Sequence, residues 1–125
     1  MNLLLDSHVL LWALEAPERL VDEARDAIAS PANRVAVSAA CVWELAIKQA
    51  LGKLRLPTEF LAGIAAASFT PLSVTLEHAF AAGALPRHHD DPFDRMLVAQ
   101  AQLEGLTIVT RDPALRRYEV TILGA

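Results

Sequence analysis

The stretch DDPFDRMLVAQA, at residues 90–101, places an acidic cluster directly before a helical pattern of apolar side chains. Asp91 is a residue type that often caps a helix, and Pro92 suits the first helical position because its missing N–H has no helical partner there. Asp94 then falls in the first turn, where the partial positive charge of the helix N-terminus favours an ionised carboxylate. Two interpretations stay open: Asp94 reaches back to form a capping box, or it holds a cation together with other acids.

Length and composition predict one domain over residues 1–125. The chain is 54% hydrophobic and long enough to bury a core without disulfides or a structural metal. Its single cysteine, Cys41, lies in an apolar run, which favours a buried side chain in a reducing cytoplasm over a nucleophile. Asp6 and His8 interrupt the apolar N-terminal segment, which has neither the basic start nor the cleavage site of a signal peptide, and no stretch is long enough to span a membrane. We therefore expect a cytoplasmic protein.

The charge balance gives a net charge of −4, from 11 Lys and Arg against 15 Asp and Glu. Taken as a sum, this argues against a phosphate-rich partner. The distribution of the charged residues along the chain changes that conclusion. If four acids gather in one metal site, the remaining 11 acids balance the 11 basic residues, and bound divalent cations reverse the local sign.

Short apolar runs alternate with helical patterns along the whole chain. We expect strands near residues 2–5, 34–38, 69–74, 106–110 and 120–123. Helices are expected between them, including one that opens at Pro17 and runs to Ala29, and one over residues 58–67. This alternation is typical of an α/β fold with a mostly parallel central sheet of four to five short strands, flanked by helices on both faces.

Acidic residues recur where these elements meet. Asp6 and Asp112 each follow a strand, Glu44 lies early in the helix after the second strand, and Asp94 lies in a first helical turn. The carboxyl ends of parallel strands lie at one edge of a sheet, so the four acids are expected to converge there. Converging carboxylates repel one another unless cations compensate, and oxygen-only ligands favour Mg²⁺ or Mn²⁺ over zinc.

Each acid also has a structural interpretation. Asp6 and Asp112 can cap the segments that follow them, and Glu44 can form a surface ion pair with Lys48 one helical turn later. The adjacent His88 and His89 are expected to be polar loop residues, because no cysteine or further histidine stands at the spacing of a zinc site.

Four segments occur in an order that resembles a known family: LDSHVLLW at 5–12, SAACVWE at 38–44, DPFDR at 91–95 and TRD at 110–112. The chain resembles PIN-domain proteins over nearly its whole length and, more narrowly, the VapC-type toxins of bacterial toxin–antitoxin pairs. Ser7 stands where these relatives often have threonine, and both residues offer a hydroxyl. The resemblance carries over four catalytic and metal-binding acids, with a fifth as accessory acid or helix cap: Asp6, Glu44, Asp94 and Asp112, and Asp91.

The resemblance implies a Mg²⁺- or Mn²⁺-dependent ribonuclease that hydrolyses RNA phosphodiester bonds. Asp6 and Asp94 are the expected direct ligands, with Glu44 and Asp112 completing or orienting the site. The resemblance also implies a cognate VapB-type antitoxin, and we expect a homodimer. Several arginines are candidate contacts for the RNA backbone, although each is also an ordinary surface charge: Arg87, Arg95 and Arg111, with Arg116 and Arg117.

Two other classes of function are compatible with an α/β fold. An inactive metal-binding or interaction module would keep the fold without the chemistry, and the intact set of acids argues against it. A phosphotransfer enzyme could use Asp6 as a nucleophile at a strand end. Such an enzyme generally needs a lysine near the site, and the only lysines, Lys48 and Lys53, do not follow a strand.

Overall fold

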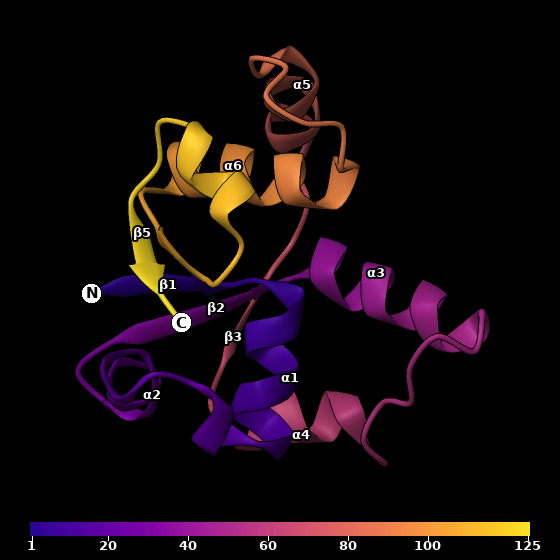
Figure 1. Ribbon diagram of the computed structural model, residues 1–125, viewed down its shortest axis with the longest axis vertical. Coiled ribbons are helices and arrows are strands. Elements are labelled where there is room, and N and C mark those ends of the chain that lie inside the picture. Colours follow the sequence, from indigo (N-terminus) through magenta and orange to yellow (C-terminus); the bar gives the residue numbers. More distant parts are fainter.

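A parallel β-sheet runs through the middle of the chain in the computed structural model, which describes residues 1–125 (Figure 1). Its strands follow in the order β3-β2-β1-β4-β5, and every neighbouring pair is parallel. Because all the strands point the same way, their carboxyl ends meet at one edge. The expected parallel sheet is confirmed. Its strands are β1 (Asn2–Leu5), β2 (Arg34–Ser38), β3 (Thr70–Leu72), β4 (Thr107–Thr110) and β5 (Ile122–Gly124).

Helices cover both faces of this sheet, as expected. In Figure 1, α1, α2 and α4 lie on one side of the strands and α5 and α6 on the other, while α3 extends away from the end of β2. The helices are α1 (Ser7–Glu15), α2 (Asp22–Ala29), α3 (Ala39–Ala50), α4 (Phe60–Ala66), α5 (Leu76–Ala84) and α6 (Pro92–Glu104). Two 3₁₀ segments complete the fold, η1 (Pro17–Arg19) and η2 (Pro113–Arg117).

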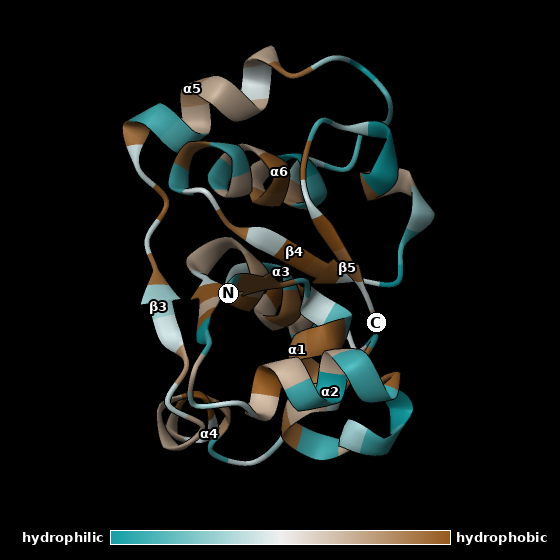
Figure 2. Cartoon of the chain, turned by 90° about the vertical axis from the view of Figure 1, so that its left-hand side faces the viewer, coloured by the Kyte–Doolittle hydropathy of each residue, from teal (hydrophilic) through white to brown (hydrophobic).

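The buried side chains form two cores, one against each helical layer. Leu3 and Leu5 of β1 pack with Leu10 of α1, whereas Leu4 packs with Leu97 of α6 on the opposite face. This division follows from the pleat of a strand, which turns successive side chains to opposite faces. In Figure 2, β4 and β5 are mainly brown and α2 is mainly teal, which matches a charged, solvent-facing α2 beside an apolar sheet.

The helix expected over residues 17–29 is wrong at its start, because the chain forms two separate elements there. The short 3₁₀ segment η1 occupies Pro17–Arg19, and α2 begins only at Asp22. Between them Leu20 and Val21 have extended backbones. Leu20 is buried in the core, and the Val21 N–H donates to the Ala125 carbonyl at 3.3 Å. Contacts with the C-terminus therefore override the helical periodicity.

Three elements have narrower or shifted limits than expected. β3 occupies only Thr70–Leu72 of the predicted 69–74, α4 begins at Phe60 instead of residue 58, and β5 begins at Ile122 instead of residue 120. β3 and β5 are the two edge strands of the sheet. An edge strand is paired on one side only, so its hydrogen bonding with one neighbour sets its length.

The start of α6 forms as its sequence predicts. Asp91 Oδ1 accepts hydrogen bonds from the backbone N–H groups of Phe93 at 2.9 Å and Asp94 at 3.1 Å, and Pro92 is the first helical residue. Asp94 does not reach back to the Asp91 N–H, so the capping-box interpretation of Asp94 is wrong. The helix ends at Gly105, whose φ of 68° is a left-handed conformation that glycine adopts without strain.

Cys41 is buried, as expected, with its thiol 3.6 Å from the Leu5 carbonyl oxygen. Burial raises the pKa of this thiol to about 12, and the neighbouring acids act in the same direction. The thiol therefore stays protonated and unreactive, which fits a structural side chain. None of the helices has the length and apolar character needed to cross a lipid bilayer.

Candidate active site

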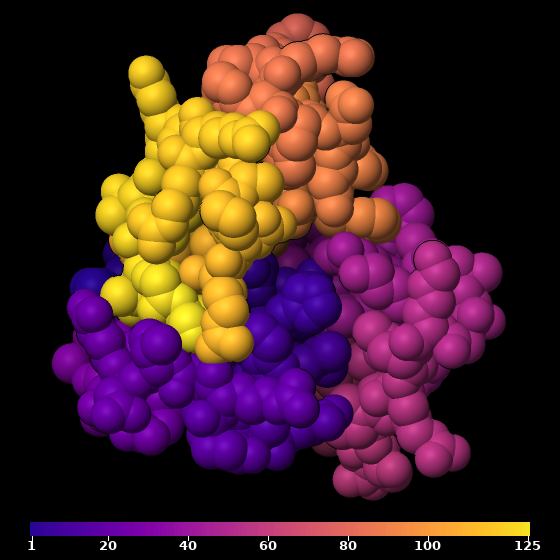
Figure 3. All heavy atoms as spheres, viewed as in Figure 1, coloured from indigo at the N-terminus to yellow at the C-terminus, as the bar shows by residue number.

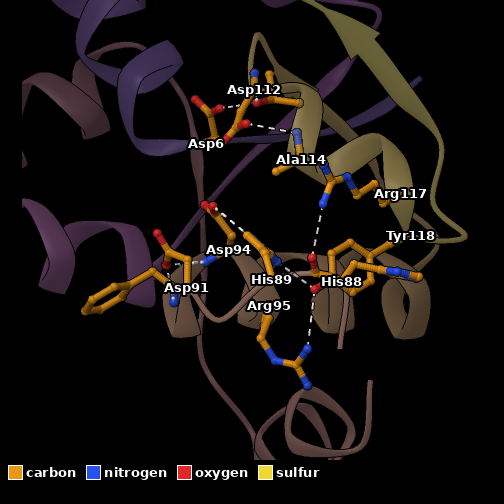
Figure 4. Close-up of polar contacts among 12 residues, drawn as sticks. Asp6, His88, His89, Asp91, Asp94, Arg95, Asp112, Ala114, Arg117 and Tyr118 are labelled. Carbon is orange, nitrogen blue, oxygen red and sulfur yellow. Dashed lines mark hydrogen bonds and ion pairs between the residues drawn. The ribbon is translucent and has the colours of Figure 1, made fainter. Parts of the chain in front are cut away.

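The structure places the four predicted acids around the carboxyl edge of the sheet. Asp6 directly follows β1, Asp112 lies just after β4, Glu44 lies in the second turn of α3, and Asp94 lies in the first turn of α6. Figure 4 shows Asp6, Asp112, Asp94 and the helix cap Asp91 facing a common space. In the space-filling view the N-terminal, α3, α6 and C-terminal segments meet around a hollow (Figure 3).

Asp6 is held by both of its carboxylate oxygens. Oδ1 accepts the Val9 N–H at 2.8 Å and so caps α1, while Oδ2 accepts a short hydrogen bond from the Thr110 hydroxyl at the end of β4. Burial raises the pKa of Asp6, and the nearby Asp112 adds to that rise, whereas the Thr110 and Val9 hydrogen bonds oppose it. The capping interpretation is therefore confirmed, and it leaves the side chain fixed at the edge of the sheet.

Glu44 is buried to the extent that only 9% of the residue is exposed. The Ser7 hydroxyl donates a short hydrogen bond to Oε1, and Lys48 Nζ lies 3.2 Å from Oε2. The ion pair with Lys48 thus forms, but it joins a buried acid to a half-buried lysine and is not an ordinary surface pair. Ser7 begins α1, so this hydroxyl ties the start of α1 to α3.

Asp94 has a pKa raised to about 6. Burial is the largest cause, and the Asp91 carboxylate is the next. Asp112 and Glu44 also raise this pKa, while the contact with His89 lowers it. Asp91, Asp112 and Glu44 therefore lie within electrostatic reach of Asp94. A carboxyl whose pKa approaches neutrality because of neighbouring carboxylates favours binding of a cation.

Asp112 is the most exposed of the four acids. Its Oδ1 accepts the Ala114 N–H at 2.9 Å and caps η2, which confirms the interpretation as a cap before Pro113. Its own N–H donates to the Thr110 hydroxyl oxygen at 3.0 Å. Thr110 therefore joins Asp6 to Asp112 through one hydroxyl group. Thr110 is not among the predicted site residues, and its only signal in the sequence is its place as the last residue of a strand, close before Asp112.

The arginines proposed to contact RNA have different surroundings. The Arg95 guanidinium donates to the carbonyls of Ala82, Leu85 and Pro86 at 2.9–3.1 Å, so it holds the segment between α5 and α6. Arg111 donates to the carbonyls of Ala125 and Arg19 and stacks on Trp12, with Cζ 4.4 Å from the ring centroid. Both guanidinium groups therefore have structural partners.

Arg87 differs from these two arginines. Its side chain is 86% exposed and makes only a 3.9 Å ion pair with Asp90, whose side chain is 91% exposed. A pair this open to solvent constrains neither partner. Of the three arginines named first as RNA contacts, Arg87 is the one whose charge remains available to a ligand.

His89 is a further residue that the sequence analysis placed only in a loop. Its Nδ1 lies 2.7 Å from the Tyr118 hydroxyl and its Nε2 lies 3.3 Å from Oδ2 of Asp94 (Figure 4). The signal in the sequence is the position of His89 close before the DPFDR motif. The Tyr118 contact has no local signal, because it joins residues 29 positions apart.

The geometry of the acids limits which cation they could hold. No group of three or more His, Cys, Asp or Glu side chains lies close enough together to hold a metal ion by itself. Mg²⁺ typically uses one or two carboxylates together with waters and substrate phosphates, whereas structural zinc requires a closed set of ligands. An open, oxygen-only donor set at the carboxyl edge of the sheet therefore suits a Mg²⁺-type ion better than structural zinc.

Comparison with known proteins matches this chain to one family. The family model of the PIN domain matches residues 3–120. Ribonuclease VapC22 of Mycobacterium tuberculosis (strain ATCC 25618 / H37Rv) is 34% identical over 120 residues, which cover 94% of this chain and 92% of that protein.

Solved structures give the same fold. VapBC2 from Rickettsia felis, bound to a DNA fragment from its promoter, superposes with a TM-score of 0.72 at 15% identity, and the match covers 100% of this chain and 99% of that one. VapBC-5 from Mycobacterium tuberculosis, a member of the VapBC family of toxin–antitoxin systems, gives a TM-score of 0.59 at 19% identity over 98% and 96% of the two chains. The match of the family model over most of the chain, together with the identity to VapC22, shows that this chain belongs to the PIN-domain family and, within it, to the VapC proteins.

Proposed function

We propose that residues 1–125 form one PIN domain that acts as a Mg²⁺- or Mn²⁺-dependent endoribonuclease, the toxin of a toxin–antitoxin pair in the cytoplasm. One observation carries the proposal. Acids from separate elements lie within electrostatic reach of Asp94 at the carboxyl edge of the sheet, where burial, followed by these carboxylates, raises its pKa to about 6. The relationship to a protein named as a ribonuclease supports RNA as the substrate.

Asp6 and Asp94 are the proposed direct ligands, and Glu44 and Asp112 complete or orient the site. When bound, the cation supplies positive charge that stabilises the attacked phosphate and makes a water molecule a better nucleophile. Asp6 is kept in place by Val9 and Thr110, and Glu44 by Ser7 and Lys48. These contacts preorganise the carboxylates, so little reorganisation is needed when RNA binds.

The substrate must reach this edge past a chain with an overall negative charge. Arg87 is the best placed of the named arginines to contact a phosphate, because its guanidinium is exposed close before the acidic motif. Asp91 has the role of helix cap, and it also raises the pKa of Asp94. We therefore propose Asp91 as an accessory acid and not as a metal ligand.

Cleavage by the purified protein tests this function. Wild-type protein should cleave RNA with Mg²⁺ or Mn²⁺ and stop when EDTA removes the ion, and Asp6→Asn and Asp94→Asn should be inactive but folded. Asp90→Asn is the matched control, because the Asp90 side chain is exposed and pairs only with Arg87. If either ligand variant cleaved RNA as fast as wild type, the assignment of the site would be wrong. A folded wild-type protein without cleavage would favour an inactive interaction module.

A VapB-type antitoxin is the proposed partner, since the solved relatives are VapBC assemblies. Apolar hollows of about 480 and 580 Å³ flank α3, and both are rich in hydrophobic side chains, among them Trp43 and Phe93 in one and Val42 and Leu61 in the other. An amphipathic antitoxin helix fits such a surface, and an antitoxin arginine would pair with the acidic site. Arginine suits this role because its planar fork can bind two carboxylate oxygens at once.

The two parts of that interaction can be separated by measuring activity and affinity together. Changing the inserted arginine to alanine should restore cleavage in the complex more than it weakens the complex, because the helix contacts persist while the cation can return. Full inhibition by this variant at saturating concentration with ample Mg²⁺ would show that a basic side chain does not block the site.

We also propose a homodimer. Leu76 and Phe80 on α5 are 88% and 84% exposed, which is unusual for large apolar side chains that lie one helical turn apart. Covering them with a second copy would remove this apolar surface from water. Light scattering should therefore give twice the monomer mass for wild type and the monomer mass for Phe80→Glu. A monomeric wild type would contradict the dimer.

A further inference from the structure

The imidazole of His89 lies between a buried phenol and a carboxylate of the site. Nδ1 is 2.7 Å from the Tyr118 hydroxyl, and Nε2 is 3.3 Å from Oδ2 of Asp94. His89 and Asp94 are both largely shielded from water, with 18% and 19% of their side chains exposed. Figure 4 shows the three side chains in a row, with Asp94 at the end that faces Asp6 and Asp112. His89 therefore contacts the acidic site directly.

Arg95 donates to the Tyr118 end of this row and so favours one direction for its hydrogen bonds. Its Nη1 donates to the Tyr118 oxygen at 3.3 Å, so that oxygen acts as an acceptor toward Arg95. The single proton of the phenol is then free to point to Nδ1 of His89. An imidazole that accepts at Nδ1 carries its ring proton on Nε2, which is the nitrogen that faces Asp94. With its ring proton on Nε2, His89 would accept from the Tyr118 hydroxyl at Nδ1 and donate to Oδ2 of Asp94.

The end of this row formed by Arg95 and Tyr118 is rigid. Arg95 is anchored by the carbonyls of Ala82, Leu85 and Pro86, which end α5 and begin the loop that carries His89. Tyr118 is buried in the core beneath α6. Because the chain of donors is fixed where it starts, the position of His89 Nε2 is fixed as well.

Asp94 has a second oxygen, Oδ1, and no protein group donates a hydrogen bond to it. A hydrogen bond on Oδ2 alone restricts the rotation of the carboxylate while Oδ1 stays accessible. A partner of this kind is the usual way in which a protein orients a metal-binding side chain, and its loss typically costs about 10–100-fold in metal affinity or activity.

We propose that His89 is a positioning residue that, oriented by Tyr118 and Arg95, holds Oδ2 of Asp94 so that Oδ1 is presented to the divalent cation. This inference rests on the proposed function, because it takes Asp94 as a ligand of the cation. It adds three residues from outside the acidic set. Arg95 acts through Tyr118, Tyr118 acts through His89, and His89 contacts Asp94. A different reading is that the row only holds the loop between α5 and α6, and the test must separate the two.

Binding of Mn²⁺ to the purified protein, measured by calorimetry without RNA, provides the main readout. His89→Ala should weaken binding about 10-fold. His89→Gln should restore most of the loss, because a glutamine amide nitrogen can reach the position of Nε2. Tyr118→Phe removes only the hydroxyl and should weaken binding several-fold, since His89 then loses the partner that fixes its proton. It also guards against the case in which His89→Ala does not fold.

His88→Ala is the matched control. The His88 ring packs edge-on against Tyr118 at 4.8 Å between centroids, but it makes no contact with an acid of the site. It should therefore bind Mn²⁺ as tightly as wild type, while thermal unfolding reports any change in the loop. Equal weakening by His88→Ala and His89→Ala, or no recovery in His89→Gln, would assign the row a role in holding the loop and overturn the proposal.

A double-mutant cycle tests whether His89 acts through Asp94. In the Asp94→Asn background, His89→Ala should cause no further loss of Mn²⁺ affinity. The same fold-loss in both backgrounds would overturn the proposal. Its failure can be distinguished from failure of the proposed function. If Asp94→Asn abolishes cleavage and weakens Mn²⁺ binding to a measurable residual affinity, but the His89 and Tyr118 variants match wild type, only the positioning role is wrong. If wild type itself neither binds Mn²⁺ nor cleaves RNA, both fall.

Discussion

The Thr110 hydroxyl donates a hydrogen bond to Oδ2 of Asp6, across the carboxyl ends of the neighbouring strands β4 and β1. The two residues are 104 positions apart in the sequence. The same hydroxyl accepts the backbone N–H of Asp112, so one side chain links the Asp6 carboxylate to the backbone of Asp112. The pairing of β1 with β4 therefore determines where the Asp6 carboxylate is held.

Replacing Thr110 by valine should reduce cleavage about 10-fold or more with little change in shape, because valine keeps the branched side chain and removes the hydroxyl. This hydrogen bond lowers the pKa of Asp6, so its loss should also move the acidic limb of the pH–rate profile to higher pH. Thr110→Ser keeps a hydroxyl and is the control. Equal activity of the valine and serine variants would show that the hydrogen bond does not matter for the site.

Local patterns in the sequence were enough to predict the strands, the cap at Asp91 and the gathering of acids at one sheet edge. Each of these depends on near neighbours: an apolar run that ends at an acid, or an Asp-Pro pair before a helical pattern. The partners of those acids could not be predicted in this way. Thr110 reaches Asp6, and Tyr118 reaches His89, only because of strand order and helix packing, which leave no mark at a fixed spacing.

The role of a charged side chain was equally hard to read from the sequence. Arg95 and Arg111 stand beside acidic motifs just as Arg87 does, but their guanidinium groups are taken up by backbone carbonyls. Whether a carbonyl is left without a partner at the end of a helix or of the chain depends on tertiary structure. From the sequence alone, all three arginines are therefore equal candidates for contact with RNA.

Asp91→Ala should lower the free energy of unfolding by about 1 kcal/mol, because the N–H groups of Phe93 and Asp94 lose their cap. It should reduce cleavage less than Asp94→Ala does. Chemical denaturation and a cleavage assay on the same samples measure both effects, with Asp90→Ala as the exposed control. An Asp91→Ala variant that is inactive but as stable as wild type would make Asp91 a metal ligand.

Substitution by alanine should affect stability at Arg95 and RNA binding at Arg87. Arg95→Ala should cost about 2 kcal/mol of stability, because three carbonyls lose a charged donor. Arg87→Ala should change stability by less than about 0.5 kcal/mol, since its side chain is exposed. Arg87→Ala should instead raise KM for RNA, more strongly at low salt than at high salt. An unchanged KM at low salt would remove Arg87 from the RNA-binding surface.

The stability of the protein should depend on pH through Asp94, and Mg²⁺ should change that dependence. The folded-state pKa of Asp94 is about 6, above the ordinary 3.8, so the folded chain binds this proton more tightly than the unfolded chain does. Protonated Asp94 therefore favours folding fully below about pH 4, and this contribution is lost as the pH rises through about 6. Because the site is partly open to water, we expect an effect of about 1 kcal/mol.

Other groups titrate over the same range, so the informative quantity is the difference in melting temperature between wild type and Asp94→Asn. In EDTA the variant should be more stable than wild type at pH 7.5, and the two should approach each other at pH 4.5. Mg²⁺ should raise the melting temperature of wild type at pH 7.5, where Asp94 is ionised, more than at pH 4.5. It should have little effect on the variant at either pH. A wild-type response to Mg²⁺ that is equal at the two values, or shared by Asp94→Asn, would mean that the cation binds away from Asp94.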